Sequence, residues 1–205
     1  MIKTTIFIFA IVVVSNCTLG VVTDITDSNT ATAFPCIVKG GYTDVTIGVS
    51  SSPTQIMVDT TGIQNLNKAK NAFTKVSLAF FSCRGRDPVK QVDEFVKKVS
   101  KDLYSQIWVY LGQESLWYQC SPSSFNAQQN CDYMHTLLNQ FKKYNVTVGI
   151  ASEESKWSDQ CSNVCNDLGS YPLYWTPNAD NTPSFSNFKP FGGWKTPAVK
   201  VYQWS

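Results

Sequence analysis

The sequence is poor in the residues on which several common chemistries depend. Histidine occurs once, at His135, and charged residues make up only 16% of the chain. There is no P-loop and no glycine-rich dinucleotide loop, so the usual phosphate-binding sites are excluded. The net charge of +2 is too small to favour nucleic acid or an anionic membrane as a partner. We expect no nucleic-acid partner, no metal and no other cofactor.

The first twenty residues have the composition of a secretory signal peptide. Lys3 supplies a positive start, the run IFIFAIVVV at residues 6–14 is apolar, and small or polar residues follow through Cys17 and Gly20. The run is far shorter than the ~20 apolar residues of a membrane helix. Cleavage after Cys17 and cleavage after Gly20 both fit this pattern. We expect residues 1–20 to be a signal peptide and residues 21–205 to be one domain. That domain would be secreted or enter the lumen of a secretory or lysosomal vesicle, with no membrane contact after cleavage.

Six cysteines remain once the leader is removed: Cys36, Cys83, Cys120, Cys131, Cys161 and Cys165. An even number in an oxidising compartment predicts three disulfides, for which 15 pairings are possible. Proximity along the chain favours Cys120 with Cys131, Cys161 with Cys165, and Cys36 with Cys83. A metal site is the competing interpretation, and it lacks ligands because there is one histidine and no paired CxxC. Asn145 opens an Asn-Val-Thr glycosylation sequon, although those residues would also suit the start of a strand.

Short apolar runs alternate with longer amphipathic stretches along the chain. Pro88 suits a first helical turn, and apolar residues recur at helical spacing behind it. Strands are predicted at 21–25, 44–49, 75–81, 106–111, 146–151, 173–176 and 198–204, and helices at 88–103, 124–143, 62–73 and 153–160. This alternation predicts an α/β fold with a parallel sheet and outer helices, a modified β/α barrel. An open doubly wound sheet is the alternative.

Two carboxylates stand where a parallel barrel collects its active groups, at the carboxyl ends of strands. Asp24 ends the first predicted strand, and Glu114 follows the strand at 106–111 after a short turn. Such a pair is the minimum equipment for glycoside hydrolysis, in which one acid protonates the leaving oxygen and the other stabilises or attacks the cationic centre. The alternative is that both are ordinary loop carboxylates.

Aromatic residues near the predicted strand ends suit sugar binding, because their rings offer broad apolar faces with polar rims. The candidates are Trp117, Tyr118, Tyr174 and Trp175, although some of them could pack the core instead. Trp117 and Tyr118 follow Glu114 closely and could supply the apolar pocket that raises the pKa of a general acid. His135 sits within an amphipathic helical pattern, so a surface histidine is favoured over a catalytic one.

Several segments together resemble the lysozymes of glycoside hydrolase family 25 found in nematodes and amoebae. The most specific is PSFSNFKPFGGWKTP at residues 183–197, within a matching stretch at 171–202. DTTGIQN at 59–65, VDEFV at 92–96, QIWVYL at 106–111 and VGIAS at 148–152 support it. The resemblance covers nearly the whole chain after the leader. It implies a flattened β/α (TIM-like) barrel and metal-free cleavage of bacterial peptidoglycan, a muramidase activity.

The resemblance carries over to the catalytic residues only in part. Asp24-Ile25-Thr26 matches the family's Asp-hydrophobic-Ser motif, and Glu114 occupies the proton donor's place in the family's Asp-x-Glu motif. The Asp of that motif is Gly112 in this chain. The family also places an Asp after its last strand, and the printed sequence ends at Ser205 before such a segment. The resemblance thus implies Glu114 as general acid and Asp24 as its partner, in an incomplete set.

Three functions follow as hypotheses. The first is a secreted lysozyme-like hydrolase of innate defence or bacterial digestion, with activity weakened by the loss of the Asp at position 112. The second is a catalytically inactive binder of cell-wall glycans, and the third is a secreted signalling protein. The expected partner is peptidoglycan or a related glycan, and the expected state is a monomer.

Overall fold

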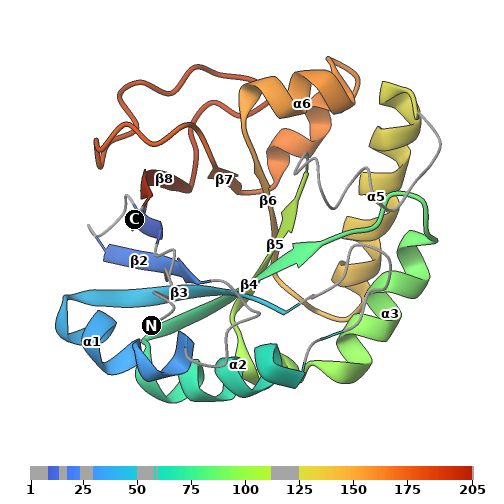
Figure 1. Cartoon of the computed structure of the whole chain (residues 1–205). Helices are drawn as coiled ribbons and strands as arrows, with labels where there is room; N and C mark the ends of the chain where they lie inside the picture. The colour runs from blue at the N-terminus through green and yellow to red at the C-terminus, as the bar shows by residue number, and fades with distance from the viewer. Residues whose placement is uncertain are drawn as a thin grey trace, which may run out of the picture.

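The computed structural model describes residues 9–13, 18–23, 30–49, 58, 60–111 and 125–204. Strands β2 to β8 pair in sequence order, and each runs parallel to the next. Strand β1 lies antiparallel between β2 and β8 and closes the barrel. Figure 1 shows α1, α2, α3 and α5 wrapping around the outside of this sheet. The α/β barrel is confirmed, and the open doubly wound sheet is not formed.

The elements follow the predicted alternation, with additions near the amino end. The strands are β1 Phe9–Val13, β2 Thr18–Thr23, β3 Tyr42–Gly48, β4 Lys75–Phe81, β5 Gln106–Tyr110, β6 Val148–Ser152, β7 Leu173–Trp175 and β8 Val199–Trp204. The helices are α1 Phe34–Lys39, α2 Thr60–Ala72, α3 Pro88–Lys98, α5 Ala127–Lys143 and α6 Glu154–Cys161, with 3-10 turns η1 Thr30–Thr32, η2 Lys101–Leu103 and η3 Asn166–Ser170. None of the helices described combines the length and apolar character needed to cross a bilayer.

Strand β1 lies inside the segment predicted to be a signal peptide. It pairs with β2 from Phe9 opposite Val22 to Val13 opposite Thr18. A short apolar run rich in β-branched residues suits the core of a leader and a buried strand equally well, so its composition does not separate the two. Cleavage after residue 20 stays a prediction. It would remove β1 and the first three residues of β2, and it would leave the rest of β2 and β8 without the strand that joins them.

The main helices begin where side-chain caps satisfy their first backbone N–H groups. The Asp87 carboxylate accepts from Val89 N at 2.8 Å and Lys90 N at 3.3 Å at the start of α3. Helix α5 opens with a reciprocal capping box between Asn126 and Gln129. These caps explain why both helices begin close to their predicted positions.

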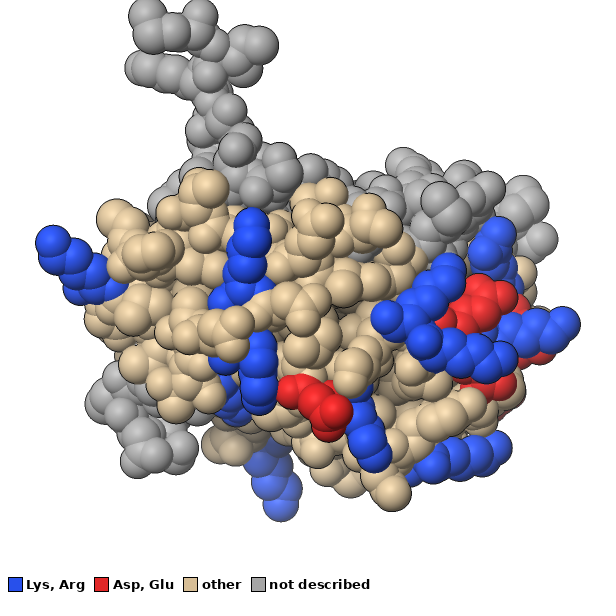
Figure 2. All heavy atoms as spheres, turned by 90° about the horizontal axis from the view of Figure 1, so that it is seen from below, with Lys and Arg blue, Asp and Glu red and all other residues tan. Residues whose placement is uncertain are grey.

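Lysines gather at the opposite, carboxyl ends of the helices. Exposed lysines occupy the last turns of four helices at Lys39, Lys70, Lys97, Lys98, Lys142 and Lys143. Cations are favoured there by the negative end of the helix dipole. Figure 2 shows basic side chains spread over one face, with acidic ones among them. The lysines at 97, 98 and 101 are thus part of a solvated surface.

The barrel strands separate two cores. Alternate residues face the helices, where Phe80, Phe95 and Phe141 form an edge-to-face cluster with centroids 5.1 to 6.0 Å apart. The residues between them face a smaller inner core that includes Ala79, Trp108 and Tyr174. Strands β4 to β7 are therefore buried on both faces, as parallel barrel strands must be.

One disulfide is present among the described residues, and it joins Cys131 to Cys165 with their Cα atoms 5.5 Å apart. The predicted pairings of Cys120 with Cys131 and of Cys161 with Cys165 are therefore wrong. Cys36 is an exposed free thiol, so its pairing with Cys83 is absent as well. The reason is a turn at Ser162, with φ of 48°, which carries the chain from the end of α6 back to α5. The expected partner of Cys131, Cys120, lies outside the described residues.

We expect Gly149→Ala to destabilise the barrel by roughly 1–3 kcal/mol through overpacking. A Cβ at Gly149 would lie 2.6 Å from Cε3 of Trp108 and 2.8 Å from the backbone oxygen of Pro172. Urea denaturation measures the change. Gly40→Ala is the matched control, because its Cβ would approach nothing closer than 3.2 Å. Adding Trp108→Phe should recover part of the loss, and equal stability of the two glycine variants would contradict this packing.

Candidate functional site

The carboxyl ends of the parallel strands define the candidate site, as in other β/α barrels. Strand β2 ends at Thr23, immediately before Asp24, and β5 ends at Tyr110, four residues before Glu114. Both strands run in the same direction, so the chain leaves them at the same end of the barrel. Asp24, Glu114, Trp117 and Tyr118 themselves lie outside the described residues. The structure describes the floor and parts of the rim around them.

An aromatic column fills the inside of the barrel beneath this end. The Phe81 and Tyr110 rings lie 4.8 Å apart, Tyr110 and Tyr174 lie 6.1 Å apart, and Trp108 meets Tyr174 edge to face at 5.3 Å. Small residues opposite them, Ala79 and Ala151, leave room for the rings. The barrel is thus a packed core, and half-buried Phe81 brings the column to the end where β4 stops.

The column is uncharged as well as apolar. Burial raises the pKa of Tyr110 above its ordinary value of 10.0, although the Tyr174 hydroxyl lowers it somewhat. Burial and the Tyr110 hydroxyl raise the pKa of Tyr174 well above 10.0. Both phenols are therefore neutral at physiological pH. A carboxyl group placed over this floor would lose hydration, which raises its pKa and favours its protonated form.

Asp44 and Glu153 are carboxyl groups close to opposite ends of the barrel strands. Asp44 stands near the start of β3, at the opposite end from the candidate site, and burial raises its pKa despite the neighbouring Lys75. Glu153 directly follows β6 at the same end as the candidate site, and its carboxylate accepts from Ser155 Oγ at 2.9 Å. Glu153 was not singled out from the sequence, because it resembles an ordinary helix start.

One rim of the site is a long loop, residues 176–198, held by a buried lysine. Lys200 is completely buried, and its Nζ lies 2.7 Å from the Asp180 carboxylate. The same ammonium donates to the backbone oxygens of Thr182 and Ser184 and to the Asn187 side chain, at 2.9 to 3.1 Å. Figure 1 shows this loop extending beyond β7 and β8. One buried charge thus orders a segment that has few regular backbone hydrogen bonds of its own.

The two aromatic candidates in β7 are covered by the chain itself. Tyr174 is completely buried inside the barrel, and Trp175 is 7% exposed. The Trp175 ring packs edge to face on Phe188 at 5.1 Å and lies 5.1 Å from the Lys200 ammonium. Their role in sugar binding stays a prediction. What the contacts show is that Tyr174 supports the floor and Trp175 supports the loop.

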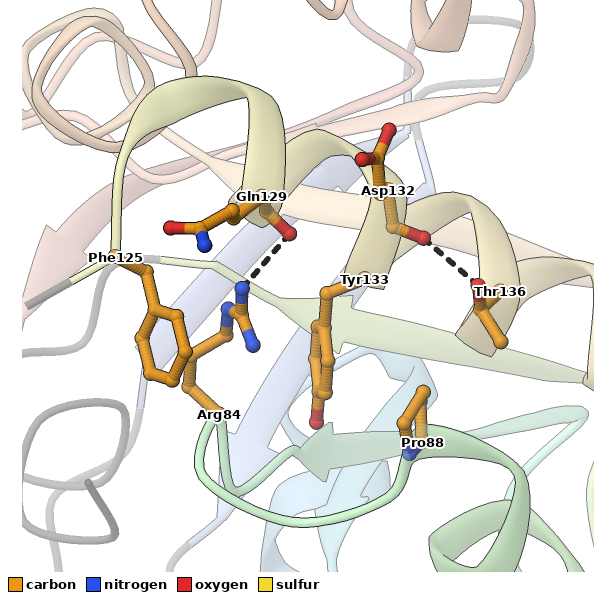
Figure 3. A pocket seen from close by; sticks show the side chains of 7 residues that line it. All are labelled: Arg84, Pro88, Phe125, Gln129, Asp132, Tyr133 and Thr136. Carbon is orange, nitrogen blue, oxygen red and sulfur yellow. Dashed lines mark hydrogen bonds between the residues drawn. The ribbon is translucent and has the colours of Figure 1, made fainter. Parts of the chain in front are cut away.

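A second rim contains an arginine between two aromatic rings, shown in Figure 3. The Arg84 guanidinium carbon lies 3.7 Å from the centroid of Phe125 and 4.6 Å from that of Tyr133. Its Nε donates to Asn130 Oδ1 and its Nη2 to the Gln129 backbone oxygen, both at 2.7 Å. A cavity of about 320 Å³ opens beside these groups. Phe125 is the first described residue after 112–124, so Arg84 anchors the carboxyl side of the segment that contains Glu114.

The two remaining candidate residues, Asn145 and His135, lie at the protein surface. Asn145 is exposed at the turn between α5 and β6, with φ of 55°. This placement leaves its side chain accessible, and its glycosylation stays a prediction. His135 lies on α5 with its Nε2 3.0 Å from the Asp167 carboxylate. It is a partly exposed surface residue, as its helical pattern indicated.

Known proteins are similar to this chain in sequence and fold. The model of the family described as lysozyme-like protein 1 matches residues 15–202. A probable GH family 25 lysozyme 2 of Dictyostelium discoideum is 27% identical over 95% of this chain and 87% of its own length. A muramidase from Acremonium alcalophilum superposes with a TM-score of 0.65 at 12% identity, over 87% of this chain and 83% of its own. The Cpl-1 endolysin complexed with a peptidoglycan analogue superposes with a TM-score of 0.59 at 14% identity, over 85% of this chain and 49% of its own.

We expect Lys200→Met to release the 176–198 loop and to lower the free energy of unfolding by roughly 2–3 kcal/mol. Removing one member of a buried ion pair leaves the charge of the other without a partner, which destabilises the fold. The loss in stability is moderated here because the Asp180 side chain is 28% exposed. Chymotrypsin should cleave the loop faster in this variant. Lys195→Met removes an exposed lysine of the same loop and is the control. Equal cleavage rates in both variants would contradict the role of Lys200 in holding the loop.

Acid should loosen the same loop. Burial tends to raise the pKa of Asp180, but hydrogen bonds from Lys200, Thr182 and Asn187 outweigh it and hold the pKa below its ordinary value of 3.8. The stabilisation is therefore present at neutral pH and is lost as the pH falls below 3.8 through the folded-state pKa. Proteolysis with pepsin across pH 2 to 5 should show loop cleavage rising at the acid end. Asp180→Asn should show a weaker dependence on pH.

Proposed function

We propose, from the premise that the chain belongs to the family of lysozyme-like protein 1, that it cleaves bacterial peptidoglycan as a muramidase of weakened activity. The chain is a muramidase-like protein of glycoside hydrolase family 25. The observation that supports cleavage is the barrel itself. The strands that lead into Asp24 and Glu114 are parallel and end at the same side of an apolar, uncharged floor.

The chemistry that we propose needs two carboxyl groups in different protonation states. Glu114 would donate a proton to the glycosidic oxygen, and Asp24 would stabilise or attack the cationic sugar. A general acid needs a raised pKa, which an apolar surrounding provides. We propose that the column of Phe81, Tyr110 and Tyr174 forms part of this apolar surrounding.

Gly112 is the reason to propose weakened activity. In the family's Asp-x-Glu motif, the residue at this position is an Asp, two residues before the proton donor. A like charge close to Glu114 would raise the pKa of that acid, and its absence leaves more of Glu114 ionised at neutral pH. The loss of one active-site group typically costs orders of magnitude in rate.

The same substitution favours a second candidate function. A chain that keeps the barrel and the ordered rims but lacks an acidic group can bind a cell-wall glycan without cleaving it. The two functions differ in whether any bond cleavage depends on Glu114.

We also propose that the protein acts outside the cytosol, in innate defence or bacterial digestion. The exposed sequon at Asn145 supports this location. The Cys131–Cys165 disulfide supports it further, because disulfides persist in oxidising compartments.

The deciding experiment compares the wild type with Glu114→Gln and Gly112→Asp. The assay follows the release of reducing ends from purified peptidoglycan, and a pull-down measures binding to the insoluble polymer. We expect slow cleavage by the wild type, a loss of at least about 100-fold in Glu114→Gln, and a gain of about tenfold or more in Gly112→Asp. Gln113→Asp adds the same charge at the neighbouring position and is the control.

The outcomes separate the candidates. Cleavage that needs Glu114 and rises with Gly112→Asp supports a weakened muramidase. Binding without cleavage in all four proteins supports the glycan-binding function instead. Cleavage that is unchanged in Glu114→Gln would exclude the proposed acid, and the absence of both binding and cleavage would reject both candidates.

A further inference from the structure

Four side chains able to bind a metal meet outside the barrel, between α5 and the chain that follows α6. Cys131 and His135 are four residues apart on α5 and therefore share one helix face. Cys165 and Asp167 belong to the start of η3. The sulfur of Cys131, a ring nitrogen of His135 and a carboxylate oxygen of Asp167 lie within 4.8 Å of one another, and the Cys165 sulfur is bonded to that of Cys131.

These separations are close to those of a tetrahedral zinc site. With Zn–S near 2.3 Å and Zn–N or Zn–O near 2.0 Å, neighbouring ligand atoms lie roughly 3.3–3.8 Å apart. The His135 Nε2 is 3.0 Å from the Asp167 oxygen. Only small movements would turn this contact between His135 and Asp167 into two ligands of one ion.

The chain has a single histidine and no paired CxxC, so the sequence alone predicts no metal site. The fold brings a Cys-x3-His segment of α5 against a Cys-x-Asp segment 34 residues later, measured from Cys131 to Cys165. Mixed thiolate, imidazole and carboxylate ligands are those that zinc accepts.

We propose that reduction of the Cys131–Cys165 disulfide converts this cluster into a Zn²⁺ site. A dithiol reductant gives two electrons and two protons to the disulfide and is itself oxidised to a disulfide, which leaves two thiols on the protein. Zinc then binds the two sulfurs, the neutral His135 ring and the Asp167 carboxylate, and the two thiol protons pass to solvent. In the disulfide form the sulfurs are not thiolates, and the four-ligand site does not exist.

The surroundings of the cluster suit this exchange. The side chains of His135 and Asp167 are 36% and 65% exposed, which gives the ion a path from solvent. Cys131 and Cys165 are buried, which shields the metal–sulfur bonds. The other nearby thiol is less suitable, because burial raises the pKa of Cys161 to about 12. Zinc would replace the covalent link between α5 and η3 with a coordinate one.

The single histidine makes the test direct. In ¹⁵N-labelled protein, a long-range ¹H–¹⁵N spectrum of the imidazole contains one residue, His135. After reduction with a phosphine and its removal, one equivalent of Zn²⁺ should shift the Nε2 resonance, and Co²⁺ should give a thiolate charge-transfer band. Zn²⁺ should raise the Tm of the reduced chain and leave that of the disulfide form unchanged.

Matched variants test each ligand. We expect His135→Ala and Asp167→Ala each to weaken zinc affinity by at least about tenfold. Cys36→Ser removes an exposed thiol elsewhere and should have no effect, and Cys161→Ser should also bind normally. Equal zinc binding by the disulfide form, or a loss of binding in Cys161→Ser, would overturn the proposed ligand set.

A last variant covers the case in which reduction unfolds the chain. Cys165→Ser cannot form the disulfide and keeps three of the four ligands, so it needs no reductant. It should bind Zn²⁺ more weakly and still shift the His135 resonance. If neither reduced wild type nor Cys165→Ser binds zinc through His135, the proposal is rejected.

Discussion

The packing of Trp108 on the backbone of Gly149 inside the barrel is the contact on which the rest of the structure depends. It joins two adjacent strands, β5 and β6, through a ring that leaves no space for a Cβ on the facing residue. Tyr174 packs against the same ring from β7, and Tyr110 continues the column toward the carboxyl end. These rings therefore fill the interior of the barrel, and they form the floor of the candidate site.

Three local interactions then hold the segments around this core. The buried Lys200 ammonium orders the 176–198 loop. Arg84, held between Phe125 and Tyr133, fixes the point where the chain enters α5. The Cys131–Cys165 disulfide ties α5 to the turn after α6 and, in the chain-entropy account, contributes roughly 4 kcal/mol for a loop of this length. All three act at segments whose own backbone hydrogen bonds do not define their position.

The two proposals concern different parts of the molecule. Peptidoglycan cleavage would depend on residues at the carboxyl end of the barrel, over its aromatic floor. Zinc binding would depend on the contact between α5 and η3, where the side chains of His135 and Asp167 reach solvent and no barrel strand takes part. Their separation lets each be tested without disturbing the other. It also means that a change in the redox state would act first on the position of α5 and η3.

The sequence by itself determined the order of strands and helices from β3 onward, the parallel barrel and the family, because these depend on local periodicity and on contiguous motifs such as PSFSNFKPFGGWKTP. It did not determine β1 or α1. Strand β4 and the carboxyl end of α5 match their predicted limits for that reason. Tertiary structure alone decided that Cys131 pairs with Cys165, that His135 meets Asp167 and that Lys200 is buried. Each of these contacts depends on the direction that the chain takes after a turn, such as the one at Ser162. The spacing of residues along the sequence does not predict that direction.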